Sequence, residues 1–284
     1  MNGIESIPTA VSTLRICWFD SVAEGVALIG FDRKQRLMSN LSARLNDFKT
    51  LWHLLISRID GQTHAERLNS FYEGQAAGYD QFRKRLLHGR CELFESLPVP
   101  ENGVWVDLGA GTGENAELWG NRLQQFQRAY LVDLCQPLLD VCSQRISERG
   151  WSHIKAVCDD ATTFAPPESH VDLITFSYSL TMIPDWFQAA NHAWDLLRPG
   201  GILGIVDFYV ARKYPQADLR AHAWIQRNLW PVWFAGDNVF LNPDHLPYLL
   251  DRFQVISLAE NQGSLPFLPL LKVPYYILIA QKPV

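Results

Sequence analysis

The stretch "VWVDLGAGTGENAELWG", residues 104–120, joins an apolar run, an acid and three glycines to the start of a helical pattern. Glycine lacks a Cβ atom, so Gly109, Gly111 and Gly113 allow a sharp turn and let a ligand approach the backbone closely. In doubly wound sheets, ligands bind where a strand ends and the next helix begins. The stretch therefore predicts a binding turn after a first strand, Val104–Leu108, although glycine turns also serve plain packing.

The chain beyond this turn alternates between short apolar runs and helical patterns. Further strands are expected at residues 129–134, 153–161, 171–180 and 201–207, and helices from residue 114, over 136–150 and over 185–197, with "LRPGG" as a turn. Two late strand candidates, 254–259 and 273–281, could form an antiparallel pair at one edge. This alternation predicts an α/β fold with a Rossmann-like, doubly wound sheet covered by helices on both faces.

The chain is expected to have three parts. They are an extension of unclear structure (1–40), an N-terminal helical cap (41–98) and the sheet domain (99–284), which carries a Trp-rich helical insertion at about 211–251. The cap opens with an apolar stripe at helical spacing between residues 41 and 59, and a second helical region is expected over 65–97. The stripe suits packing on the core, and it also suits a helix that lies on a lipid surface.

Bulk composition excludes several classes of protein. With 284 residues, 48% of them hydrophobic, the chain can bury a sizeable core, and its net charge of −5 argues against a nucleic-acid-binding surface. The five cysteines lack C-x-x-C spacing, so we expect neither a disulfide framework nor a metal site. We find no spanning segment and no signal peptide, and expect a cytoplasmic protein for which contact with a membrane surface stays open.

Three acids stand near the ends of the first three expected strands. Asp107 could meet an ammonium group there. Asp133, which follows Gly113 by 20 residues, could accept hydrogen bonds from both hydroxyls of a ribose. Asp160 and the backbone N–H of Ala161 could read the edge of an adenine. Each acid alone suits a solvated or capping role, but the set on consecutive strands predicts a site for a nucleoside cofactor.

The motifs "VDLGAGTG", "LVDL", "DDA" and "LRPGG", in this order, resemble those of class I S-adenosylmethionine-dependent methyltransferases over about residues 100–210. The resemblance implies a seven-stranded sheet whose late hairpin supplies a reversed strand, and S-adenosylmethionine as cofactor, with S-adenosylhomocysteine as product. The cofactor residues it implies are Tyr72, Asp107, Gly109, Ala110, Gly111, Gly113, Asp133, Leu134, Asp160, Ala161 and Ser177, with Phe164 beside the adenine. The glycine spacing disfavours a dinucleotide-dependent oxidoreductase.

The flanking segments resemble the diacylglyceryl-homoserine N-methyltransferases of betaine-lipid synthesis. This similarity extends over about residues 50–282 and is carried by "ERLNSFYEGQAAGYDQFRKRLLHGR" (66–90), "VDFYVARK" (206–213) and "VPYYI" (273–277). It implies three successive methylations of the homoserine amine, giving diacylglyceryl-trimethylhomoserine. The implied partners are a lipid headgroup as substrate and an aminocarboxypropyl transferase, which is not attached here; no nucleic acid is expected.

Methyl transfer to an amine needs an unprotonated nitrogen aligned with the methyl group. A free α-amino group titrates near ~8, so losing its proton at neutral pH costs roughly 1.4 kcal/mol, and orientation can supply much of the acceleration. We expect catalytic or positioning roles for Tyr79, Tyr178, Asp207 and Tyr209; the alternative for the tyrosines is a plain core role.

The substrate residues are expected on the basic segment and in the insertion. They are Arg83, Arg85 and Arg90 as clamps for a carboxylate, His222 as a possible proton acceptor together with His245, and Trp230 in a lipid slot or a cap over the site. The arginines equally suit a basic face near anionic lipid, or a solvated face. The other functions considered are methylation of a soluble amine or a quinone precursor, and a non-catalytic S-adenosylmethionine-binding subunit.

Overall fold

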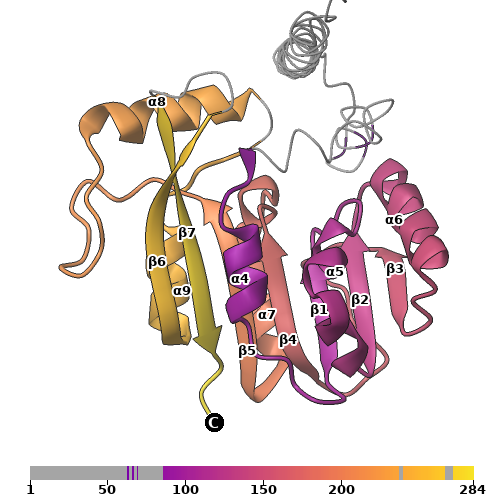
Figure 1. Ribbon diagram of the computed structural model, residues 1–284. Helices are drawn as coiled ribbons and strands as arrows, with labels where there is room; N and C mark the ends of the chain where they lie inside the picture. The colour runs from indigo at the N-terminus through magenta and orange to yellow at the C-terminus, as the bar shows by residue number, and fades with distance from the viewer. Residues whose placement is uncertain (1–62, 64–65, 67–68, 70–85, 237–238, 266–270) are drawn as a thin grey trace, which may run out of the picture. The chain divides into compact units, whose positions relative to one another are not determined.

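The computed structural model describes residues 63, 66, 69, 86–236, 239–265 and 271–284 (Figure 1). Within them, one sheet has the strand order β3-β2-β1-β4-β5-β7-β6. The strands are β1 (Val104–Leu108), β2 (Arg128–Asp133), β3 (Ile154–Cys158), β4 (Val171–Ser177), β5 (Leu197–Phe208), β6 (Gln254–Ser264) and β7 (Lys272–Gln281). Strands β1 to β5 pair in parallel, whereas β7 runs antiparallel to β5 and β6. The expected α/β fold with a reversed strand in the late hairpin is confirmed.

Helices cover both faces of the sheet. They are α4 (Arg90–Ser96), α5 (Glu114–Leu118), α6 (Gln136–Arg149), α7 (Trp186–Leu196), α8 (Trp224–Ala235) and α9 (His245–Arg252), with short 3₁₀ helices η1 (Gly120–Gln125) and η2 (Leu180–Met182). Side chains of α4, α5 and α6 share one core cluster, and those of α7 and α9 share the other. In the ribbon, α4 and α5 lie in front of the sheet and α7 and α9 lie behind it (Figure 1). Because both faces are covered, β1 is buried along its whole length and reads as a continuous apolar run.

An aromatic cluster holds β1 in place. The Trp105 ring lies 6.2 Å from Phe94 of α4, 5.5 Å from Trp119 and 5.6 Å from Phe126. Its indole N–H donates to Thr175 Oγ1 of β4 at 2.9 Å, so the one polar atom of this fully buried side chain is satisfied. The strand that leads into the glycine turn is thereby anchored to its neighbours.

Several element boundaries differ from expectation. The helix after the glycine turn ends at Leu118, because Gly120 adopts φ 54° and the chain continues as η1. The "LRPGG" segment lies within β5 rather than before it: Gly200 has φ 75°, and the pairing with β4 shifts register between Val171 and Leu173. This is a bulge in the strand, not a turn that precedes it.

The expected helix over 65–97 is interrupted. Residues 87–89 are not helical, Gly89 has φ 80°, and α4 begins only at Arg90. In the insertion, α8 and α9 form as expected, but residues 211–223 are irregular. The stripe at 41–59 and the extension at 1–40 lie outside the described residues. No helix built from the described residues has the length and apolarity to cross a membrane.

Candidate active site

The glycine turn connects β1 to α5 in left-handed backbone. Gly109, Gly111 and Gly113 have φ 78°, 57° and 71°, values that side chains other than glycine rarely adopt. The N–H groups of Gly109 and Ala110 both donate to the carbonyl of Val132, at 2.8 and 3.0 Å. Two backbone hydrogen bonds therefore hold the glycine turn against the end of β2.

Packing inside the protein also demands two of these glycines. A Cβ on Gly109 would lie 2.3 Å from Ser179 Cβ, and one on Gly113 would lie 2.5 Å from Cys142 Sγ. The Ser179 hydroxyl donates to the Leu108 carbonyl at 2.6 Å, which holds Ser179 against the turn. The turn is thus shaped by its own neighbours before any ligand binds, and the plain-packing explanation accounts for part of the motif.

Asp133 closes the turn from the tip of β2. Its Oδ2 accepts from the Gly111 N–H, and its Oδ1 accepts from the Cys135 N–H, each at 2.8 Å. The side chain stays partly exposed. The N–H of Gln136, the first residue of α6, donates to Asn69 Oδ1 at 3.1 Å. Asn69 was not among the expected site residues, because a contact with a helix 67 positions away leaves no local signal.

Asp107 lies inside the protein rather than at the surface of the turn. Its side chain is fully buried and accepts from Asn115 Nδ2 at 2.8 Å and from Thr175 Oγ1 at 2.6 Å. Asn115 Oδ1 in turn accepts from Nε and Nη2 of Arg90 at 3.2 and 2.7 Å. In this structure Asp107 joins β1 to α5 and β4, and its expected contact with an ammonium group stays a prediction.

Arg90 is held in the same network. Its Nη1 lies 2.8 Å from Glu114 Oε2, and both side chains are only 6% exposed. The guanidinium therefore neutralises an internal acid instead of standing free to clamp a carboxylate. The other two candidate arginines, Arg83 and Arg85, lie outside the described residues, as do Tyr72 and Tyr79.

The tip of β3 is bound into its own loop. Asp160 Oδ1 accepts from the N–H and the hydroxyl of Thr162, at 2.8 and 2.7 Å. Ala161 and Phe164 are buried in the core cluster of α7 and α9, where the Phe164 ring lies 5.6 Å from Tyr130. Leu134, after β2, is half-buried. Contacts of these residues with an adenine stay a prediction.

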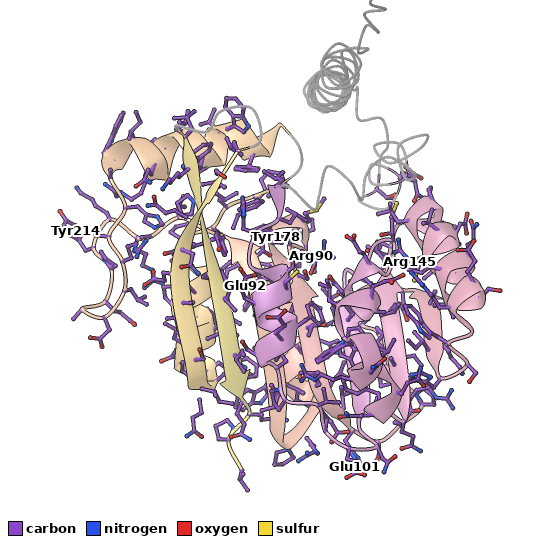
Figure 2. All side chains as sticks on the ribbon, in the orientation of Figure 1. Arg90, Glu92, Glu101, Arg145, Tyr178 and Tyr214 are labelled. Atoms are coloured by element: carbon purple, nitrogen blue, oxygen red, sulfur yellow. The ribbon has the colours of Figure 1, made fainter. Side chains whose placement is uncertain are left out.

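Tyr178 follows β4 in a strained conformation, with φ 56°. Its hydroxyl donates to the His88 carbonyl at 2.6 Å, and its ring lies 4.5 Å from Phe208 (Figure 2 labels Tyr178). Burial raises the pKa of Tyr178 well above its ordinary value. The phenol is therefore a neutral positioning group that fixes residues 86–90 on the sheet edge, not a base.

Asp207, near the end of β5, is fully buried. It accepts from the Thr181 N–H at 3.0 Å, the Thr181 hydroxyl at 2.7 Å and the Phe208 N–H at 2.8 Å. Burial raises the pKa of Asp207 to about 7, against the opposing effect of these donors. Ser177, at the end of β4, is 1% exposed, and its hydroxyl has no hydrogen-bond partner among the described residues. Ser177 is thus a buried polar group available to a ligand.

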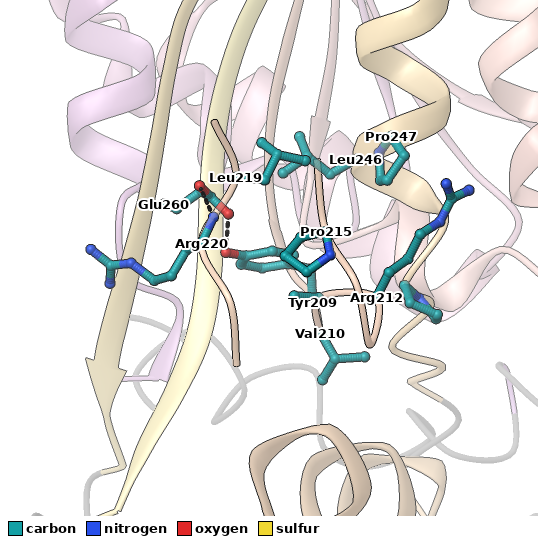
Figure 3. A pocket seen from close by; sticks show the side chains of 11 residues that line it. Tyr209, Val210, Arg212, Pro215, Leu219, Arg220, Leu246, Pro247 and Glu260 are labelled. Carbon is teal, nitrogen blue, oxygen red and sulfur yellow. Dashed lines mark hydrogen bonds between the residues drawn. The ribbon is translucent and has the colours of Figure 1, made fainter. Parts of the chain in front are cut away.

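The structure separates Tyr209 and His222 from Tyr178. Tyr209 belongs to the core cluster on the other face, and its hydroxyl donates to Glu260 Oε1 at 2.5 Å. It lines a small surface pocket with Leu219 (Figure 3). His222 Nδ1 accepts from the Ala211 N–H at 3.0 Å, its ring lies 4.8 Å from Tyr209, and burial lowers its pKa.

Two further residues of the insertion are internal. Trp230 is 2% exposed and packs 6.0 Å from Phe234, which lies 4.8 Å from Phe208, so Trp230 shares a cluster with Tyr178. His245 is fully buried, its ring lies 4.3 Å from Trp186, and burial lowers its pKa to about 3. His245 therefore stays neutral at physiological pH.

Residues 106–201, which contain the glycine turn and the tips of β2 to β4, match the family described as a methyltransferase domain. The fold is that of a class I methyltransferase. Among solved structures, the phosphoethanolamine N-methyltransferase 2 of Haemonchus contortus, in complex with phosphomonomethylethanolamine and S-adenosylhomocysteine, has a TM-score of 0.60. It is 12% identical over 79% of this chain and 61% of that chain. YcgJ from Bacillus subtilis has a TM-score of 0.53 and 14% identity over 69% and 99% of the two chains.

Curated relatives of this methyltransferase domain include enzymes of quinone synthesis. The ubiquinone/menaquinone biosynthesis C-methyltransferase UbiE of Pseudomonas putida (strain GB-1) is 26% identical over 207 residues, 71% of this chain and 79% of the relative. The demethylmenaquinone methyltransferase of Geobacillus stearothermophilus is 23% identical over 146 residues, 50% of this chain and 62% of the relative. For three such relatives the match spans only 61–66% of the relative's length.

The cofactor of the class I methyltransferase fold is S-adenosylmethionine. The residues at the strand tips suit it. The partly exposed Asp133 carboxylate can accept from ribose hydroxyls, Gly111 places left-handed backbone without a Cβ atom beside that carboxylate, and Ser177 offers an unsatisfied hydroxyl. Among the residues that the structure describes, no group of His, Cys, Asp or Glu side chains could hold a metal ion.

Proposed function

We propose that this chain transfers the methyl group of S-adenosylmethionine to an acceptor at the carboxyl edge of its sheet. The observation that carries the proposal is the glycine turn, which packs against Ser179 and is bonded through the Gly111 N–H to Asp133. In open α/β sheets this edge is where ligands bind. The names of the curated relatives, all methyltransferases, agree with it.

The side chains around the turn suit positioning rather than proton transfer. Bound S-adenosylmethionine supplies an electrophilic methyl group and leaves as S-adenosylhomocysteine. The rings of Tyr178 and Phe208 pack 4.5 Å apart, and the Tyr178 hydroxyl donates to the His88 carbonyl. His88 is in turn held by a hydrogen bond of 2.9 Å between its Nε2 and the Ser264 carbonyl. Aromatic side chains held in place in this way can exclude water and help to orient an acceptor.

The first candidate acceptor is a quinone precursor. It is favoured by the names of the curated relatives, which are C-methyltransferases of ubiquinone and menaquinone synthesis and demethylmenaquinone methyltransferases. A ring carbon can attack a methyl group once a neighbouring ring hydroxyl has lost its proton; the carbon then releases its own proton to restore the aromatic ring. This candidate replaces the lipid amine as the leading acceptor.

The second candidate is the amine of diacylglyceryl-homoserine, methylated up to three times. It is favoured by the flanking motifs, whose similarity extends over about residues 50–282, well beyond the domain match at 106–201. For this candidate, the substrate is a lipid headgroup and an aminocarboxypropyl transferase supplies it. The chain would then work in the cytoplasm at a membrane surface. A soluble amine and a non-catalytic S-adenosylmethionine-binding subunit remain alternatives.

The test is mass spectrometry of each acceptor class after incubation with the chain and methyl-labelled S-adenosylmethionine. A quinone precursor should gain one carbon-bound methyl group, whereas diacylglyceryl-homoserine should gain one, two and three on nitrogen. The Gly111→Arg variant, which fills the turn, should abolish both. Binding of S-adenosylmethionine without formation of S-adenosylhomocysteine under any acceptor would contradict a catalytic role, and undiminished turnover by Gly111→Arg would show that the cofactor site is misplaced.

A further inference from the structure

One face of helix α6 lies against the glycine turn. Cys142, Arg145 and Arg149 follow one another at spacings of three and four residues, which places them on the same face of the helix. The Cys142 Sγ lies 2.5 Å from the position that a Cβ on Gly113 would take. Arg145 Nη1 donates to the carbonyl of Thr112 and, at 3.3 Å, to the Thr112 hydroxyl (Figure 2 labels Arg145). This face of α6 therefore contacts the last two residues of the turn.

The peptide between Thr112 and Gly113 is held at both of its polar atoms. Its oxygen accepts from Arg145, and its nitrogen, the Gly113 N–H, donates to the Ala110 carbonyl at 3.0 Å. Thr112 is fully buried, so water cannot readily replace a lost donor. A hydrogen bond from a charged donor is stronger than one between neutral groups. Arg145 therefore fixes the orientation of the peptide through which the turn enters α5.

Arg145 is itself held in place by α5. Its Nε lies 3.6 Å from Glu117 Oε1, and its side chain is 19% exposed. Arg149, one helical turn further along α6, donates to the same carboxylate at 3.0 and 2.9 Å. The side chain of Arg149 is 56% exposed, and its hydrogen bonds within the described part of the chain go to Glu117 and not to the turn. The two arginines thus share a helix face and a partner, but only Arg145 touches the turn.

We propose that Arg145 is a positioning residue for the cofactor. By holding the peptide between Thr112 and Gly113, it keeps the glycine turn in its binding conformation before the cofactor arrives. This role rests on the proposed function, which assigns the turn to S-adenosylmethionine. At its other end α6 follows Cys135, whose N–H donates to Asp133, so the helix connects the acid at the tip of β2 to the turn after β1. A turn that is competent for only part of the time binds with an affinity reduced by that fraction.

The first test needs no cofactor. Hydrogen exchange at the Gly113 N–H, followed by NMR, measures how often the turn opens. Arg145→Met keeps an unbranched side chain and removes the guanidinium, so exchange at Gly113 should become about tenfold faster or more. The control is Arg149→Met, which loses the same Glu117 partner and should leave this exchange within about twofold of the native rate. Equal exchange in Arg145→Met and the native chain would overturn the proposal.

The second test is calorimetry with S-adenosylhomocysteine. Arg145→Met should lower the affinity about tenfold, whereas Arg149→Met should leave it unchanged. Arg145→Lys can still donate from its ammonium group to the Thr112 carbonyl, so its affinity should lie within about threefold of the native value. Urea unfolding of the same variants separates positioning from stability. An Arg145→Met variant that is less stable but binds S-adenosylhomocysteine with native affinity would show a purely structural role and would count against the proposal.

Failure of this role and failure of the proposed function give different results. A native chain that binds no S-adenosylhomocysteine would contradict the proposed function, and the role of Arg145 in cofactor binding with it. A native chain that binds S-adenosylhomocysteine, together with unchanged affinity in Arg145→Met, would overturn the role of Arg145 alone. Faster exchange at Gly113 combined with weaker binding in Arg145→Met, and neither change in Arg149→Met, supports the proposal directly.

Discussion

At the scale of single residues, the candidate site contains a backbone conformation and a buried acid that few other residue types could replace. Gly109 combines φ 78° with a Cβ position only 2.3 Å from Ser179 Cβ. Asp207 is an acid without exposed surface, whose pKa is raised to about 7. Both features sit at strand ends, and each leads to a measurable consequence.

The Gly109→Ala substitution should lower the free energy of unfolding by about 2–4 kcal/mol, because backbone strain and a steric clash with Ser179 add. Its affinity for S-adenosylhomocysteine should fall by about tenfold or more, measured by calorimetry. The matched control is Gly120→Ala. Gly120 also has positive φ, 54°, but no atom lies within 4 Å of its Cβ position. The Gly120→Ala control should lower the free energy of unfolding by about 1 kcal/mol, from backbone strain alone, and should bind S-adenosylhomocysteine with normal affinity. Equal effects of both substitutions would contradict the importance of the turn's packing.

Asp207 should make stability fall as pH rises. Its folded pKa, about 7, lies above the ordinary 3.8, so the folded state binds the proton more tightly than the unfolded state. The stabilisation is complete below the ordinary pKa and is lost as pH rises through the folded pKa. Urea unfolding of Asp207→Asn at about pH 4 and about pH 8 should show a flatter dependence on pH than the native chain. If stability depends on pH equally steeply in Asp207→Asn and in the native chain, another group causes the pH dependence.

At the scale of elements, a buried ion pair joins α4 to α5. Arg90 and Glu114 are both 6% exposed, and Arg90 also donates to Asn115, which donates to Asp107. This chain of contacts links the segment before the sheet to β1 and to the start of the helix after the glycine turn. A charge left alone in this interior is expensive, whereas the loss of both charges is far cheaper.

Arg90→Met should therefore destabilise the protein by about 3–5 kcal/mol, and adding Glu114→Gln should recover a large part of that loss. The comparison is Arg149→Met. Arg149 pairs with Glu117 at 2.9 Å, but its side chain is 56% exposed, so we expect a loss under about 1 kcal/mol. Chemical denaturation of the native chain and these three variants measures these values. A double variant as unstable as Arg90→Met would mean that the arginine acts through packing, not charge.

At the scale of the whole molecule, both core clusters and the strand tips belong to one sheet, so a ligand at those tips should stabilise the fold. At a concentration about 100 times its dissociation constant, a ligand that binds only the folded state adds about 2.7 kcal/mol. S-adenosylhomocysteine should therefore raise the melting temperature by about 5–10 °C. Asp133→Ala should reduce this rise, whereas Asp140→Ala, an exposed change on α6, should not. No rise with the native chain would argue against the site.

The order of the elements was predictable from the sequence because its signals are local. Apolar runs bounded by glycines and acids predicted the strands within a few residues, and β1 at Val104–Leu108 without error. Gly150, in the left-handed conformation, ends α6 where the pattern placed a helix stop. The glycine spacing likewise predicted a sharp turn, and all three of its glycines have positive φ. Signals of this kind depend on neighbours along the chain, so they survive without tertiary contacts.

Only the tertiary structure decided the surroundings of the side chains. It placed Tyr178 and Tyr209 in clusters on opposite faces, bound Arg90 to Glu114, and buried Asp107 beneath the turn. Partners such as Asp107 and Thr175 are 68 residues apart, and no local pattern encodes such a distance. Local periodicity therefore determined which strands and turns form. The packing of distant segments determined which polar groups satisfy one another and which, like the Ser177 hydroxyl, stay available to a ligand.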